Sequence, residues 1–189
     1  PLCATQAAAA GGSQADRELE HLRALACIDE VTGLCNRRHL MAQAEAAWHL
    51  ARAQGPALCL LAFEVPQVAH LAGTLGQAAA NTLTSALAAR LVADSPAQSV
   101  LGHLGDGEFA ALLPQHGGPD RAAALQLAAR WQALLQEPVA LADLTVYPQC
   151  AIGLAFEPGD KGSGDAVDAH ALLVAAQSAR REAEGTGTP

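Results

Sequence analysis

The chain has 189 residues and a formal net charge of −8; 51% of its residues are hydrophobic and 3% are aromatic. The length suits one α/β domain with a short appendage. The acidic charge and the few aromatic rings argue against a nucleic-acid partner, which needs clustered Lys and Arg and stacking surfaces. No apolar run reaches the ~18 residues of a membrane span. We therefore expect a cytoplasmic location, either as a free protein or as the cytoplasmic part of a membrane-anchored one.

The first part of the chain divides into a lead-in, a helix and a turn. Residues 1–13 are rich in Ala and Gly without periodicity, which indicates a flexible lead-in. Residues 14–28 carry leucines at three- and four-residue steps, which predicts a linker or signalling helix with one apolar stripe. That stripe either packs on its own domain or forms a coiled coil that leads to an upstream segment. Residues 29–38 form a polar turn, and a helix follows to about residue 53.

The rest of the chain mixes strands and helices. Residues 57–63, ALCLLAF, are a continuous apolar run typical of a buried central strand. Gly105, Asp106 and Gly107 have the composition of a tight turn between two strands. The expected strands are 99–104, 108–113, 139–146 and 149–156, and the expected helices are 67–71, 78–93, 120–135 and 169–183, with a loop at 159–164. This order predicts an α/β sandwich with an antiparallel hairpin in a central mixed sheet, flanked by helices.

Several segments of the chain, in this order and at this spacing, resemble the motifs of the GGDEF family. Residues 29–38, DEVTGLCNRR, are similar to the family's D-x-L-T-G-L-P-N-R-R segment. Residues 103–109, HLGDGEF, stand where the family has R-x-G-G-D-E-F, and their last five letters form the signature. Residues 64–68, EVPQV, correspond to D-x-D-x-F, and residues 150–155, CAIGLA, to the S-x-G-x-A strand. The resemblance covers residues 29–187 and implies the nucleotide-cyclase-like fold of that family, with the signature on a β-hairpin.

The resemblance also implies a chemistry for which this chain lacks parts. The family makes cyclic di-GMP from two GTP molecules, and acidic side chains hold Mg²⁺ against the triphosphate. At the two metal positions this chain has Glu64, a weak candidate ligand, and Gly107, which has no ligand atom. Asp106 places a carboxylate where the family has a bare glycine, although Glu108 and Phe109 are retained. We therefore expect no functional catalytic residue in the signature and no cofactor, with Mg²⁺ bound only if residual GTP binding remains.

The positions that contact the base and the phosphates are altered as well. Ala72 stands where the family has an Asn that binds guanine, and Asn81, a weak candidate for nucleotide binding, replaces an Asp. Glu184 and Thr188 replace a Lys and an Arg that contact phosphates. Residues 96–99 lack the R-x-x-D motif of the product-inhibition site, so we expect no such site.

Three functions are compatible with these residues. The expected one is a catalytically inactive GGDEF-like module that relays a signal or regulates a linked or partner domain, such as an EAL phosphodiesterase or a receptor domain. Such a module could form a homodimer through the helix expected at residues 14–28. The second is an active diguanylate cyclase with the unusual GDGEF signature, which the retention of Glu64, Glu108 and Phe109 favours. The third is a sensor that binds GTP without hydrolysing it.

Overall fold

The computed structural model describes residues 26–54, 57–113, 121–142, 144–157 and 168–186. The predicted lead-in, nearly all of the predicted helix at 14–28 and the predicted loop at 159–164 lie outside these ranges. Within them, no helix combines the length and the hydropathy that a bilayer crossing requires.

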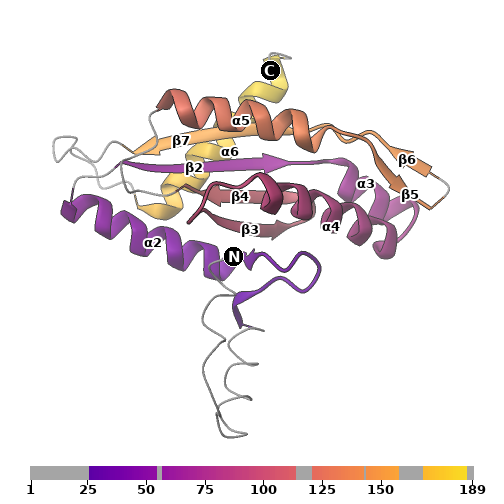
Figure 1. Ribbon diagram of the computed structural model, residues 1–189, viewed down its shortest axis with the longest axis horizontal. Helices are drawn as coiled ribbons and strands as arrows, with labels where there is room; N and C mark the ends of the chain where they lie inside the picture. Colours follow the sequence, from indigo (N-terminus) through magenta and orange to yellow (C-terminus); the bar gives the residue numbers. More distant parts are fainter. Residues whose placement is uncertain (1–25, 55–56, 114–120, 143, 158–167, 187–189) are drawn as a thin grey trace, which may run out of the picture.

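A five-stranded mixed sheet forms the centre of the molecule (Figure 1). Its strands follow the order β1 (Cys35–Asn36), β3 (Val100–Gly105), β4 (Glu108–Leu112), β2 (Leu58–Glu64) and β7 (Ala151–Glu157). β1 runs parallel to β3, whereas the other neighbouring strands are antiparallel. The signature therefore lies at the connection between β3 and β4, next to the end of the central strand β2.

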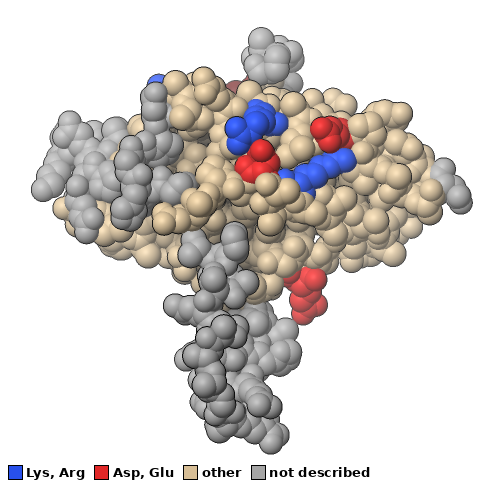
Figure 2. Space-filling model, viewed as in Figure 1, with Lys and Arg blue, Asp and Glu red and all other residues tan. Residues whose placement is uncertain are grey.

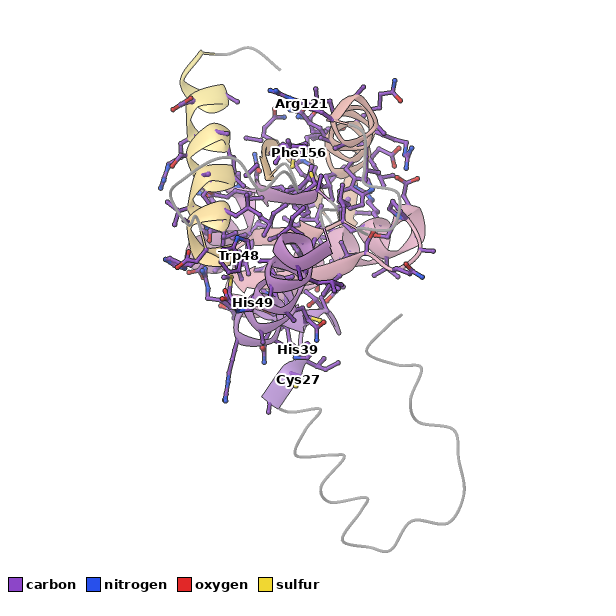
Figure 3. All side chains as sticks on the ribbon, turned by 90° about the vertical axis from the view of Figure 1, so that its left-hand side faces the viewer. Cys27, His39, Trp48, His49, Arg121 and Phe156 are labelled. Atoms are coloured by element: carbon purple, nitrogen blue, oxygen red, sulfur yellow. The ribbon has the colours of Figure 1, made fainter. Side chains whose placement is uncertain are left out.

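Helices cover both faces of this sheet. One face carries α2 (Arg37–Gln54) and α6 (Ala169–Thr186), and the other carries α3 (Gln67–Thr74), α4 (Gln77–Asp94) and α5 (Arg121–Leu135). The end-on view of Figure 3 shows α6 and α5 on opposite sides of the sheet. Strand β2 is apolar throughout because its alternate side chains enter two different cores. One core contains Leu58, Leu60 and Ala62, and the other contains Cys59, Leu61 and Phe63.

The predicted α/β sandwich with its hairpin is confirmed, but the single strand predicted at 139–146 is wrong. The chain turns there, and β5 (Val139–Leu141) and β6 (Leu144–Val146) pair as a separate two-stranded hairpin. Ala142 adopts a positive φ of 47° at this turn, a conformation that alanine does not signal in a sequence. The two-residue strand β1 was also missed, because it is too short to show any periodicity.

Among the cysteines that the structure describes, Cys27 and Cys59 are free thiols. Cys59 lies fully buried in β2, and burial raises the pKa of its thiol to about 12. A thiol with that pKa carries almost no thiolate at neutral pH, so Cys59 is a packing residue rather than a reactive one.

Candidate functional site

The signature forms a two-residue turn between β3 and β4. Asp106 and Gly107 have φ angles of 49° and 83°, and positive φ at both central residues is what a type I′ hairpin turn requires. Asp-Gly is a favoured pair for that turn, so local chemistry alone explains the hairpin. The register of the two strands shifts between His103 and Gly105, which marks a β-bulge just before the turn.

Gly107 is buried against the segment that follows β2. Its carbonyl oxygen accepts a hydrogen bond of 3.0 Å from the backbone nitrogen of Val65. A Cβ on Gly107 would lie 2.5 Å from the Val65 carbonyl oxygen and 2.8 Å from Val68 Cβ. The metal position that the resemblance places on Gly107 therefore has no ligand atom, and this hairpin has no room for one.

Two carboxylates remain at this end of the sheet, and both are paired with arginines. Glu64 of β2 lies directly opposite Glu108 of β4 in the strand register, and each side chain is 28% exposed. The guanidinium of Arg180 contacts Glu64 through Nη1, and its Nη2 lies 3.8 Å from Glu108 Oε1. Nη2 of Arg37 lies 3.3 Å from Glu108 Oε2 and donates a 3.2 Å hydrogen bond to the Leu104 carbonyl. Two negative side chains are thus matched by two positive ones.

Arg180 reaches this cluster from inside the fold, because its side chain is only 6% exposed. Gly153 of β7 makes that position possible: a Cβ there would overlap the Ala176 carbonyl and the Arg180 backbone nitrogen. Helix α6 therefore rests directly on the backbone of β7. Sequence reasoning missed Arg180, although a signal was present. Arg180 continues, at helical spacing, the buried stripe of Ala169, Leu172, Leu173 and Ala176.

The residues present do not fit the Mg²⁺ that the family resemblance implies. Among the described residues, His, Cys, Asp and Glu side chains nowhere form a group of three that could hold a metal ion. Among the described residues, Glu64 and Glu108 form the cross-strand carboxylate pair at this end of the sheet, and the Arg180 guanidinium contacts both. A hard divalent cation needs several free oxygen ligands, and both carboxylates are already engaged by guanidinium groups.

The polar turn at residues 29–34 packs beside the signature strand. Asp29 Oδ1 accepts hydrogen bonds from the backbone nitrogen and the hydroxyl of Thr32, at 2.9 and 2.7 Å. His103 of β3 is 10% exposed, and its Nδ1 lies 3.0 Å from the same oxygen. The two side chains are therefore in direct polar contact. It ties the turn that opens the domain to the strand that carries the signature.

This turn should make stability depend on acid pH. Burial alone would raise the pKa of Asp29, but hydrogen bonds from Thr32 and the contact with His103 outweigh it and lower the pKa below 3.8. A carboxyl with a lowered folded pKa stabilises the fold above its unfolded pKa, and that contribution is lost as pH falls through the folded pKa. We expect the melting temperature to fall more steeply between about pH 5 and pH 3 in the wild type than in Asp29→Asn. Melting curves over this range test it, with the exposed Asp106→Asn as control; identical slopes for wild type and Asp29→Asn would refute it.

A pocket of about 220 Å³ lies between α3, α4 and the hairpin. It is lined by Ala72 and Asn81, the two positions that the resemblance assigns to guanine, and by Asp106 of the turn. Asn81 Oδ1 accepts a 2.8 Å hydrogen bond from Gln77 Nε2, which leaves its amide NH₂ available as a donor. Among the described residues, neither Glu64 nor Glu108 lines this pocket, and no Lys or Arg does. The pocket has room for a planar ring, and the described part of its lining provides no Lys or Arg for phosphates.

On the face drawn in Figure 2, a small group of side chains of both signs lies over α4 and α5, and a further acidic side chain lies apart at the lower edge. Arg130 of α5 pairs with Asp94 of α4 at 2.7 Å. Arg90 of α4 donates hydrogen bonds to the carbonyl of Leu134 in the last turn of α5 and to those of Glu137 and Pro138, which follow the helix. These charges join the two helices, and the described residues of this face form no basic surface of the kind that a phosphate backbone needs.

The positions predicted to contact phosphates at the C-terminal end fall at the limit of the structure. Glu184 belongs to α6, but its side chain is not among those described, and Thr188 lies outside the described residues.

The sequence of this chain matches known proteins. The sequence profile described as "Diguanylate cyclase, GGDEF domain" matches residues 26–188. The chain belongs to the GGDEF family. This GGDEF domain is 29% identical over 155 residues to an uncharacterized signaling protein of Caulobacter vibrioides, a match that covers 82% of this chain and 19% of that protein. It thus spans about a fifth of the length of that relative.

Solved structures share the fold. A sensory box/GGDEF family protein from Caulobacter crescentus CB15 superposes with a TM-score of 0.73 at 26% identity, covering 84% of this chain and 98% of that one. The diguanylate cyclase SiaD from Pseudomonas aeruginosa, solved in complex with its activator SiaC, superposes with a TM-score of 0.75 at 20% identity, covering 92% and 64%. GGDEF domains are therefore seen together with regulators, and the family places this chain in cyclic di-GMP signalling.

Proposed function

We propose that this GGDEF domain is a catalytically inactive signalling module. The main support for this proposal is the condition of the residues at and beside the family's two metal positions, Glu64 and Gly107. Gly107 is closed by Val65 and Val68, and the carboxylates Glu64 and Glu108 are engaged by arginines. Phosphoryl transfer from GTP relies on metal ions to neutralise charge on the phosphates. Without them, the charge on the triphosphate stays unneutralised, and Asp106 adds a further negative charge at the neighbouring pocket.

The proposed output is a contact with another domain or protein. The Caulobacter vibrioides relative is a signaling protein, and most of its length lies outside the match to this chain. We propose that this module regulates a linked or partner domain, such as an EAL phosphodiesterase or a receptor domain. A homodimer through the helix expected at residues 14–28 would bring two such modules together.

The test is direct: the purified chain at high concentration is incubated with GTP and Mg²⁺ or Mn²⁺, and cyclic di-GMP is measured by mass spectrometry. We expect no more product than with the Glu64→Gln/Glu108→Gln variant, while an active diguanylate cyclase run in parallel confirms the conditions. Product that forms with the wild type and disappears in the double variant would establish the active-cyclase alternative and overturn the proposal.

Binding of guanine nucleotide without turnover is the second candidate, favoured by the pocket that Asn81 lines. The absence of Lys and Arg from the described lining argues against a triphosphate. Thermal shifts with GTP, GDP and guanosine separate the two functions. The relay proposal predicts no shift with any of them, whereas a shift with GTP that Asn81→Ala removes would establish a nucleotide sensor.

A further inference from the structure

We infer that Arg180 is an internal replacement for a divalent cation, so that its guanidinium, and not a metal ion, holds Glu64 and Glu108 side by side. The inference rests on the proposed function, because it explains how the two carboxylates of an inactive site stay together. It also predicts how folding stability responds to divalent metal, which a catalytic assay does not measure.

The two carboxylates lie opposite each other on neighbouring strands. Glu64 and Glu108 are cross-strand partners on β2 and β4, and their side chains leave the same face of the sheet. Directly opposed side chains of this kind have Cβ atoms about 4.5–5.5 Å apart, and like charges at that separation destabilise a sheet. A cation between or beside them relieves this repulsion.

The side chain of Arg180 is placed to bridge the two carboxylates. Its two terminal nitrogens are divided between the carboxylates, with Nη1 on Glu64 and Nη2 3.8 Å from Glu108. A planar guanidinium can bridge two acceptors in this way, and it keeps its charge at any physiological pH. One fixed side chain thus supplies the bridging positive charge that a bound ion would otherwise supply.

The two arginines that contact these carboxylates, Arg37 and Arg180, differ in their exposure to solvent. Arg37 is 52% exposed, and an exposed ion pair contributes little to stability. Arg180 is 6% exposed and is held by the close packing of α6 on Gly153. A metal ion that entered would have to displace Arg180 and leave a buried cation without its partners, which is strongly unfavourable. The wild-type domain should therefore be indifferent to divalent metal.

The experiment uses Arg180→Met, which keeps much of the side-chain length and removes the charge. We expect its melting temperature without metal to fall by on the order of 10 °C, because two carboxylates lose their buried cation. Millimolar Mn²⁺ should then restore about 5 °C or more by binding the uncovered carboxylates. The wild type should show no shift with Mn²⁺. The matched control is Arg181→Met, a neighbouring exposed arginine whose side chain contacts Ser178, and it should behave as the wild type does.

If Arg180→Met does not fold on its own, a double variant still tests the inference. In Arg180→Met/Glu108→Gln the repulsion is gone, so we expect it to fold without metal and to lose the Mn²⁺ response. If neither Mn²⁺ nor Glu108→Gln restores Arg180→Met, Arg180 is a packing residue and the inference is wrong. It is equally wrong if Mn²⁺ stabilises the wild type, and in that case the absence of cyclic di-GMP would still leave the proposed function in place.

Discussion

Replacing Gly107 by Asp, which restores the acidic third letter of the family signature, is expected to destabilise this domain without restoring GTP turnover. The residue sits at φ 83°, and a Cβ would meet the Val65 carbonyl oxygen at 2.5 Å and Val68 Cβ at 2.8 Å. Backbone strain and overpacking each cost on the order of 1–3 kcal/mol, so we expect a loss of about 3 kcal/mol or more. For a chain of this size that is a fall in melting temperature of roughly 6–12 °C.

The control variant separates steric from electrostatic causes. Gly107→Ala adds the Cβ without a charge and should lose most of the same stability. Thermal unfolding and a cyclic di-GMP assay are run on each protein. A Gly107→Asp variant with wild-type stability and metal-dependent product would show that the turn can accept the acidic ligand, contrary to the structure.

Gly153→Ala is expected to be at least as damaging, because the added methyl group would fall between β7 and α6. It would overlap the Ala176 carbonyl and the Arg180 backbone nitrogen, so the helix must move away from the sheet. The move would disturb packing along α6 and draw Arg180 away from Glu64. Overpacking with loss of a buried ion pair predicts about 3 kcal/mol or more, measured by urea or thermal unfolding.

Gly73→Ala is the matched control, since Gly73 lies exposed in α3 and an added Cβ would meet nothing within 4 Å. Alanine is favoured over glycine in a helix by roughly 1 kcal/mol, so this variant should be as stable as the wild type or more stable. Equal stability of Gly153→Ala and the wild type would mean that α6 does not rest on β7 as closely as the structure shows.

The fold was predictable where local pattern and tertiary environment agree. The apolar run of β2 indicates a strand buried on both faces, and the Asp-Gly pair of the signature indicates a tight hairpin; both are present. The break at Ala142 was not predictable, because alanine carries no signal for a positive φ. Strand β1 was not predictable either, since two residues pair with β3 only through the tertiary fold.

The site was predictable in its positions but not in its contacts. Glu64 and Glu108 could be named as the carboxylates in question, but their register across β2 and β4 is a property of the assembled sheet. Arg180 was missed because an arginine late in a helix usually faces solvent, and only its place on the buried stripe of α6 argued otherwise. The closure of Gly107 depends on Val68, which the chain brings to the hairpin after a turn that sequence cannot place.

The most direct test of this account is a crystal structure of the domain soaked with Mn²⁺ and a non-hydrolysable GTP analogue. We predict no anomalous peak between Glu64 and Glu108, with the Arg180 guanidinium in contact with both carboxylates. A manganese ion bound by these two side chains, with Arg180 displaced and a triphosphate beside it, would contradict the account.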